Sequence, residues 1–174
     1  MFADSPLVVA PSGSCVHMVR EKYGDLLEGR DLADWEDLRT RIHELTDFLT
    51  GVRGIKAWGG SYKASAVLHW SCHLPQKEHV QAGVERLLGS IPGLDLLPRP
   101  DFECCGFGGS FWALWREVSA AIGRRRIHVL SKDDPDTLLL AEPGCLLQMR
   151  LSVKESGRDI RVRHVAEVLA EALT

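Results

Sequence analysis

Residues 138–150, LLLAEPGCLLQMR, contain the pattern that decides the fold. An apolar run of strand length is followed by a Pro-Gly turn, a cysteine and a segment with helical composition. Residues 7–20, LVVAPSGSCVHMVR, repeat the same order when one residue is gapped in the turn. The two stretches predict two related strand–turn–helix units, each with a cysteine where its helix begins.

Along the rest of the chain, short apolar runs alternate with longer segments in which apolar residues recur at helical spacing. Such alternation is typical of a parallel sheet with helices on its faces. We therefore predict an α/β fold, a Rossmann-like parallel sheet with flanking helices. The predicted strands are 7–10, 66–70, 94–97, 137–140 and 160–162, and the predicted helices begin near 16 and 146 or span 31–50, 80–88, 107–130 and 164–173.

A second match follows each unit in the same order along the chain. The segment HELTDFL (43–49) resembles RHVAEVL (163–169). Two matches in one order indicate a duplication rather than a chance likeness. We therefore predict that residues 1–60 are the C-terminal part of a first pseudo-repeat. Residues 61–174 are predicted to be a complete second, cysteine-rich repeat that contains the sequence CCG at 104–106.

The second repeat also has a front half that the first does not show. SCH at 71–73 and CCG at 104–106 both precede Cys145, whereas the first strand follows almost directly on Met1. By the logic of the repeat, we expect that a stretch of about seventy residues is absent upstream, the distance by which Cys72 precedes Cys145.

Composition excludes several classes of protein. Apolar residues make up 45% of the 174 residues and the formal net charge is −3, which fits a globular chain that does not bind nucleic acid. The run Arg124-Arg125-Arg126 is interpreted as the solvated face of a helix. No apolar run is long enough to insert into a membrane, and the short run at 7–10 does not resemble a signal peptide, so we expect a cytoplasmic protein.

The cysteines carry the chemical signal. There are five, an odd number, and Cys104 and Cys105 are adjacent and cannot form a relaxed disulfide with each other. Cys72 follows one predicted strand, and Cys145 lies at another strand-to-helix turn. Because the carboxyl ends of parallel strands meet at one edge of the sheet, we expect these four thiols to converge there. Four soft thiolates suit an iron–sulfur cluster.

The glycines around the tandem cysteines fit the same hypothesis. Gly106, Gly108 and Gly109 are predicted to let the backbone approach a cluster, with the amides of the next helix facing its negative charge. Two alternatives stay open. One is a zinc site with His73 as a further ligand, in a docking module without catalysis. The other is a redox-sensing thiol at Cys104 or Cys105, whose pKa the helix start would lower.

Several motifs together resemble the cysteine-rich CCG iron–sulfur family. These are PSGSC, ELTDFL, SCHL, CCGFGG, PGCL and HVAEVL, which cover nearly the whole chain. The family includes one of the subunits of heterodisulfide reductase, the iron–sulfur subunit of glycolate oxidase and the lactate-utilisation iron–sulfur protein A. The resemblance implies a duplicated Rossmann-like fold and a subunit of an oxidoreductase complex that oxidises L-lactate or a similar 2-hydroxy acid.

The resemblance also implies a ligand set and partners. It assigns Cys72, Cys104, Cys105 and Cys145 to a cluster of the second repeat, and Cys15 matches the last ligand of the first. The first CCG motif of the family is missing, as is the second thiol of a final Cys-x-x-Cys, which favours a four-thiol 4Fe–4S centre. We expect the chain to transfer electrons between other subunits of the complex, and to associate with them or with a second copy of itself.

Overall fold

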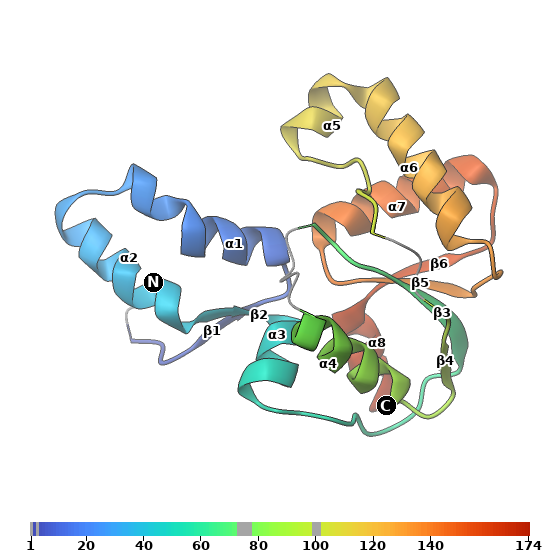
Figure 1. The fold of residues 1–174 in the computed structure, drawn as a ribbon, viewed down its shortest axis with the longest axis horizontal. Helices are drawn as coiled ribbons and strands as arrows, with labels where there is room; N and C mark the ends of the chain where they lie inside the picture. The colour runs from blue at the N-terminus through green and yellow to red at the C-terminus, as the bar shows by residue number, and fades with distance from the viewer. Residues whose placement is uncertain (1, 3, 73–77, 99–101) are drawn as a thin grey trace.

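A four-stranded parallel sheet is the centre of the larger part of the molecule (Figure 1). The computed structural model describes residues 2, 4–72, 78–98 and 102–174. The strands lie in the order β4-β3-β5-β6, and every neighbouring pair is parallel. Their bounds are β3 Ala64–His69, β4 Leu94–Leu96, β5 Thr137–Leu140 and β6 Arg161–His164. The predicted α/β class with a Rossmann-like parallel sheet is confirmed.

The strand order reverses between β3 and β5. The chain runs from β3 to β4 on one side and then returns to β5 on the other side of β3. The register pairs Ala66 with Thr137 and His69 with Leu140, so β3 and β5 end together. In open α/β sheets, a crevice forms outside the carboxyl ends of the strands at such a reversal. The turns after β3 and β5 therefore lie side by side at this crevice.

Two helices cover each face of this sheet. Helices α4 (Glu78–Gly89) and α8 (Val165–Ala172) cover one face, while α6 (Arg116–Leu130) and α7 (Pro143–Ser156) cover the other (Figure 1). Alternate residues of a strand point to opposite faces, and both faces are buried here. Leu68 accordingly packs into the first core, while its neighbour Val67 packs into the second.

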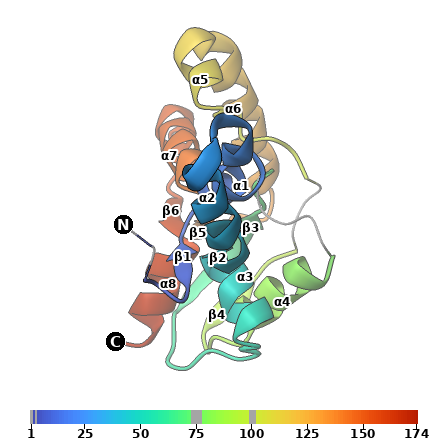
Figure 2. The same ribbon diagram turned by 90° about the vertical axis from the view of Figure 1, so that its left-hand side faces the viewer.

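A second, two-stranded parallel sheet lies beside the larger one. Strand β1 (Val8–Ala10) pairs with β2 (Ile42–Glu44), and helices α1 (Gly13–Glu21) and α2 (Gly29–Arg41) connect them. Figure 2 shows these helices from the side on which they project. The prediction of one helix over 31–50 is wrong, because β2 interrupts it after α2. A short helix α3 (Leu45–Asp47) and a π-helical turn (Phe48–Val52) complete the segment.

The segments that match in sequence occupy matching elements. Strand β1 leads into α1 and pairs with β2, as β5 leads into α7 and pairs with β6. Glu44 at the end of β2 and His164 at the end of β6 both cap the following helix through their side chains. The division into a partial repeat over 1–60 and a complete repeat over 61–174 stays a prediction.

The predicted helix over 107–130 is also interrupted. It begins as α5 (Ser110–Leu114), breaks at Trp115 with φ −124° and ψ 53°, and continues as α6. The loop before α5 folds back onto α6, where the Ser119 hydroxyl donates to the carbonyl of Gly106 at 2.7 Å. This tertiary contact fixes the loop against α6 and separates α5 from it. Among the described residues, no helix is both long and apolar enough to cross a membrane.

Candidate metal centre

All five cysteines line one cavity of about 770 Å³. Cys72 follows β3, Cys145 lies in the first turn of α7, and Cys104 and Cys105 lie in the loop before α5. Cys15 lies in the first turn of α1, so the smaller sheet brings a thiol to the same cavity. The expected convergence of thiols at the carboxyl edge of the sheet is observed, and Cys15 is not isolated from the other four.

Four of the thiols form a continuous chain of contacts. The Sγ atoms of Cys105 and Cys145 are 3.1 Å apart, and both residues are buried. Cys104 is hydrogen-bonded through its side chain to Cys105 and also to Cys72. Cys72, Cys104 and Cys15 are more exposed, and all five cysteines are free thiols. The buried pair lies at the base of the cavity, and the exposed thiols lie nearer its mouth.

Burial and the contacts between neighbouring thiols raise the pKa of Cys72, Cys104 and Cys105. Burial, followed by the neighbouring Cys104, raises the pKa of Cys72. The hydrogen bond that the Cys104 thiol donates to Cys105, with burial, raises the pKa of Cys104. The bond to Cys104 lowers the pKa of Cys105, but the bond to Cys145 and burial outweigh it and raise that pKa to about 12. The predicted lowering of thiol pKa at Cys104 and Cys105 is therefore wrong. A bound cation would displace these protons.

The CCG turn directs backbone amides at the sulfurs. The N–H of Gly106 donates to Sγ of Cys104 at 3.3 Å, and the N–H of Phe107 donates to Sγ of Cys105 at 3.5 Å. Gly108 and Gly109 line the cavity and have φ of 56° and 58°, a region that favours glycine. Gly106 is not in the cavity lining.

Gly106 is required by packing against α6. Its φ is 86°, and a Cβ there would lie 2.8 Å from the carbonyl oxygen of Ser119 and 2.9 Å from Cβ of Ile122. A side chain at this position would push the loop away from α6 and move both cysteines before it. Gly106 therefore positions the thiols, while close approach of backbone to the cavity belongs to Gly108 and Gly109.

A buried histidine lies beside the two deepest thiols. A ring nitrogen of His69 and the sulfurs of Cys105 and Cys145 all lie within 4.8 Å of one another. Nε of Arg126 donates to Nδ1 of His69 at 3.2 Å. Burial, followed by the charge of Arg126, lowers the pKa of His69 to about 3, so the imidazole is neutral. Sequence reasoning missed His69, because it lies before the SCH motif of residues 71–73, at the end of a strand that is expected to be buried.

Arg126 is one residue of the basic run that was expected to face solvent. Arg124 and Arg125 are exposed and form ion pairs with Glu155 and Glu103. Arg126 is only 1% exposed, so the interpretation of the run as a solvated face is wrong for this residue. Helical spacing carries the missed signal: the buried face of α6 consists of Ser119, Gly123, Arg126, Ile127 and Leu130.

Glu142 joins the two helix starts that carry cysteines. Its carboxylate accepts the N–H and the hydroxyl of Ser14, each at 2.8 Å, and the N–H of Gly144 at 3.4 Å. One buried side chain thus caps α7 and binds the first turn of α1. This contact holds Cys15 and Cys145 around one cavity although 130 residues separate them in sequence.

His73, proposed as a zinc ligand, lies outside the described residues.

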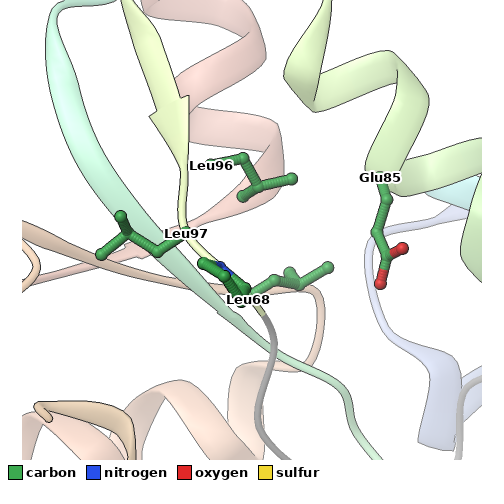
Figure 3. A pocket seen from close by; sticks show the side chains of 5 residues that line it. Leu68, Glu85, Leu96 and Leu97 are labelled. Atoms are coloured by element: carbon green, nitrogen blue, oxygen red, sulfur yellow. The ribbon is translucent and has the colours of Figure 1, made fainter. Parts of the chain in front are cut away.

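A second cavity of about 320 Å³ lies between β4 and α4 (Figure 3). Its described lining residues are Leu68, Leu96, Leu97, Pro98 and Glu85, which are apolar apart from one carboxylate. The cysteine-lined cavity therefore concentrates the soft ligands, and it fits a thiolate-bound metal or cluster.

Four of the five cysteines lie in a segment that matches a known protein family. Residues 66–150 match the family described as a cysteine-rich domain, CCG. The chain is 34% identical over 178 residues to Lactate utilization protein A 2 of Bacillus cereus (strain Q1), covering 99% of this chain and 73% of that protein. It is 37% identical over 173 residues to Lactate utilization protein A of Geobacillus kaustophilus (strain HTA426), covering 97% and 71%.

Proposed function

Because this chain belongs to the lactate utilization A proteins of the cysteine-rich CCG family, we propose that it is an iron–sulfur electron-transfer subunit. The observation that carries the proposal is the single cavity lined by five free thiols. Thiolates are the usual ligands of iron–sulfur clusters, and four of them bind a 4Fe–4S cluster, one for each iron. Peptide N–H groups already donate to two of the sulfurs, as they do where thiolate charge must be stabilised.

The ligand set proposed for a 4Fe–4S cluster is the continuous chain of four thiols, Cys72, Cys104, Cys105 and Cys145. Such a cluster would supply one-electron transfer at low potential. Cys15, at the mouth of the same cavity, is an additional candidate ligand. Gly108 and Gly109 would leave room for the cluster against the backbone.

The substrate class and partners follow from the relatives' name and from the cavity lining. The relatives are lactate utilization proteins, so we propose L-lactate or a similar 2-hydroxy acid as the electron source. The described lining of the cavity includes Glu142 but neither lysine nor arginine, and thus offers no fixed cation for a carboxylate substrate. The acid would be oxidised on another subunit of an oxidoreductase complex in the cytoplasm, and this chain would carry the electrons onward.

Anaerobic reconstitution tests the proposal. Protein incubated with ferrous iron and sulfide without oxygen is expected to develop a charge-transfer band in the visible spectrum and an EPR signal on reduction. Cys105→Ser removes a buried thiol in contact with Cys145 and should abolish both signals. A wild-type protein that folds yet develops neither signal would refute the electron-transfer function.

A zinc-stabilised docking module is the second candidate, and one observation favours it. His69, Cys105 and Cys145 are all buried and lie close enough to share one metal ion. Metal analysis of protein purified without oxygen separates the candidates, since one equivalent of zinc with negligible iron would favour the docking module. The redox-sensing alternative receives less support, because the raised pKa of Cys104 and Cys105 lowers their thiolate fraction.

A further inference from the structure

The contact between His69 and Arg126 determines which nitrogen of the imidazole carries the proton. Both side chains are only 1% exposed, and Nε of Arg126 donates to Nδ1 of His69 at 3.2 Å. A guanidinium has five N–H donors and no acceptor, so Nδ1 must present a lone pair. A neutral imidazole has one N–H group. The proton of His69 is therefore on Nε2.

The second nitrogen has no other use within the part of the chain that the structure describes. Nε2 of His69 is buried and has no hydrogen-bond partner there. A buried donor without an acceptor costs roughly 1–3 kcal/mol. The sulfurs of Cys105 and Cys145 are candidate acceptors, because a ring nitrogen of His69 lies within 4.8 Å of both, although Nε2 does not hydrogen-bond to them in the metal-free chain.

We propose that, once Cys105 and Cys145 are deprotonated cluster ligands, Nε2–H of His69 donates a hydrogen bond to their sulfurs rather than binding the metal itself, and that Arg126 is the positioning residue that fixes this tautomer. A metal-bound nitrogen needs the lone pair that Nε2 lacks while Arg126 occupies Nδ1. The consequence for the cluster rests on the proposed function: the pair raises its reduction potential. The tautomer itself does not depend on that function.

The direction of the effect follows from charge. Reduction adds an electron to an anionic centre, and an N–H donor to its sulfurs stabilises the added charge. The guanidinium of Arg126 acts in the same direction, because its positive charge is buried and weakly screened. Removal of the donor should therefore make the cluster harder to reduce.

The tautomer is measured on the metal-free wild-type protein. Long-range ¹⁵N–¹H correlation NMR on histidine-labelled protein, kept reduced and anaerobic, separates the two tautomers, and His69→Gln assigns the signal. We expect His69 to be neutral at pH 7 with its proton on Nε2. A proton on Nδ1, or a charged imidazolium, would overturn the proposal whether or not a cluster ever assembles.

The potential is measured by an EPR-monitored redox titration of reconstituted protein. His69→Leu removes the donor, and we expect about a tenfold lower ratio of reduced to oxidised cluster at a fixed ambient potential, about 59 mV for one electron. His69→Gln, whose amide keeps both an acceptor and an N–H donor, should recover part of this loss. His128→Leu, the same substitution at an exposed position of α6, should leave the potential unchanged.

Further outcomes decide between ligand and donor. An unchanged potential in folded His69→Leu, or strong nitrogen hyperfine coupling that shows direct ligation in the wild type, would overturn the proposal. Arg126→Met should lower the potential and release the Nδ1 lone pair. If Arg126→Met does not fold, the NMR measurement on the wild type still tests the tautomer, and the potential of His69→Gln still tests the donor role. A wild type that binds no cluster but shows the Nε2–H tautomer would refute the proposed function alone.

Discussion

Glu142 is the residue on which the arrangement of the helix starts depends. Its carboxylate accepts from Ser14 in α1 and from Gly144 in α7. We expect Glu142→Ala to lower the free energy of unfolding by about 2 kcal/mol, because it removes a helix cap and leaves buried donors unpaired. Denaturant unfolding of the metal-free protein measures this loss. Glu142→Gln, which keeps one acceptor, should lose less, and equal stability of all three proteins would contradict the role.

His164 makes the stability depend on pH. Its Nδ1 accepts the N–H of Ala166 at 3.0 Å. Burial lowers its pKa, and the backbone of Ala141, followed by the charge of Glu167, offsets part of this lowering. As pH falls below about 6.5, His164 is protonated in the unfolded chain but stays neutral in the folded chain. The free energy of unfolding therefore decreases by up to about 1.4 kcal/mol per pH unit. Above that pH, His164 is neutral in both states and its full contribution to stability is present.

His164→Asn tests this dependence, because asparagine also caps helices and does not titrate. We expect the variant to unfold near the wild-type denaturant midpoint at pH 7.5 and to lose less stability than the wild type at pH 5.5. His128→Asn, at an exposed position, is the matched control and should follow the wild type. Parallel pH profiles for His164→Asn and the wild type would disprove the assignment.

At this scale the sequence reveals the cysteines but not their surroundings. Thiols after strand ends can be located because topology alone brings strand ends together. The placement of His69 and Arg126 depends on which side chains of β3 and α6 face each other, and no local pattern encodes that contact. Arginine side chains are mostly exposed, so Arg126 is expected to face solvent. Its burial depends on a hydrogen bond to His69, which lies 57 residues away in the sequence.

At the scale of elements, helices α6 and α7 approach each other closely at Gly123, and a substitution there tests how they pack. A Cβ at Gly123 would lie 2.6 Å from Nε2 of Gln148 and would also collide with Oγ of Ser152. We expect Gly123→Ala to destabilise the protein by about 1–3 kcal/mol, because the two helices must separate. Thermal and denaturant unfolding measure the change.

Gly89 provides the control for Gly123. It ends α4, and a Cβ there would meet nothing within 4 Å. Gly89→Ala should therefore leave stability unchanged or raise it slightly by restricting the unfolded chain. If Gly123→Ala were as stable as Gly89→Ala, the close approach of α6 and α7 would be wrong.

The elements of the larger sheet were predictable, whereas the segment 31–50 was not. Strands β3 and β5 each contain three consecutive apolar residues, 66–68 and 138–140, and are buried on both faces, which is a strong signal. Strand β2 is three residues, Ile42–Glu44, set between two helices, and its pairing with β1 is non-local. A strand so short adds no periodicity of its own, so the helical spacing on either side hides it.

At the scale of the whole molecule, the cavity depends on both sheets, since α1 brings Cys15 and the larger sheet brings the other four thiols. The repeat in sequence predicted that β1–α1 and β5–α7 are alike. It could not predict that they meet, because the contact consists of hydrogen bonds from Ser12 and Ser14 to Glu142, which no pattern in the sequence marks. The motifs of the sequence assign Cys15 to the first repeat, apart from the other four thiols, whereas the geometry places all five around one cavity.

Cys15 therefore decides how many thiols the centre uses. We expect Cys15→Ser to retain most of the iron and the EPR signal, because the chain of contacts from Cys72 to Cys145 is complete without it. Cys145→Ser, a matched substitution in the corresponding helix start, should lose both. Equal loss in the two variants would indicate a five-thiol centre in place of a four-thiol one.

The most direct measurement is the content of iron, acid-labile sulfide and zinc per folded chain after anaerobic reconstitution, for the wild type beside Cys105→Ser. We expect iron and sulfide in equal amounts in the wild type, little zinc, and loss of both iron and sulfide in the variant. Negligible iron in the wild type with one equivalent of zinc, or the same iron content in both proteins, would contradict a cluster held by the converging thiols.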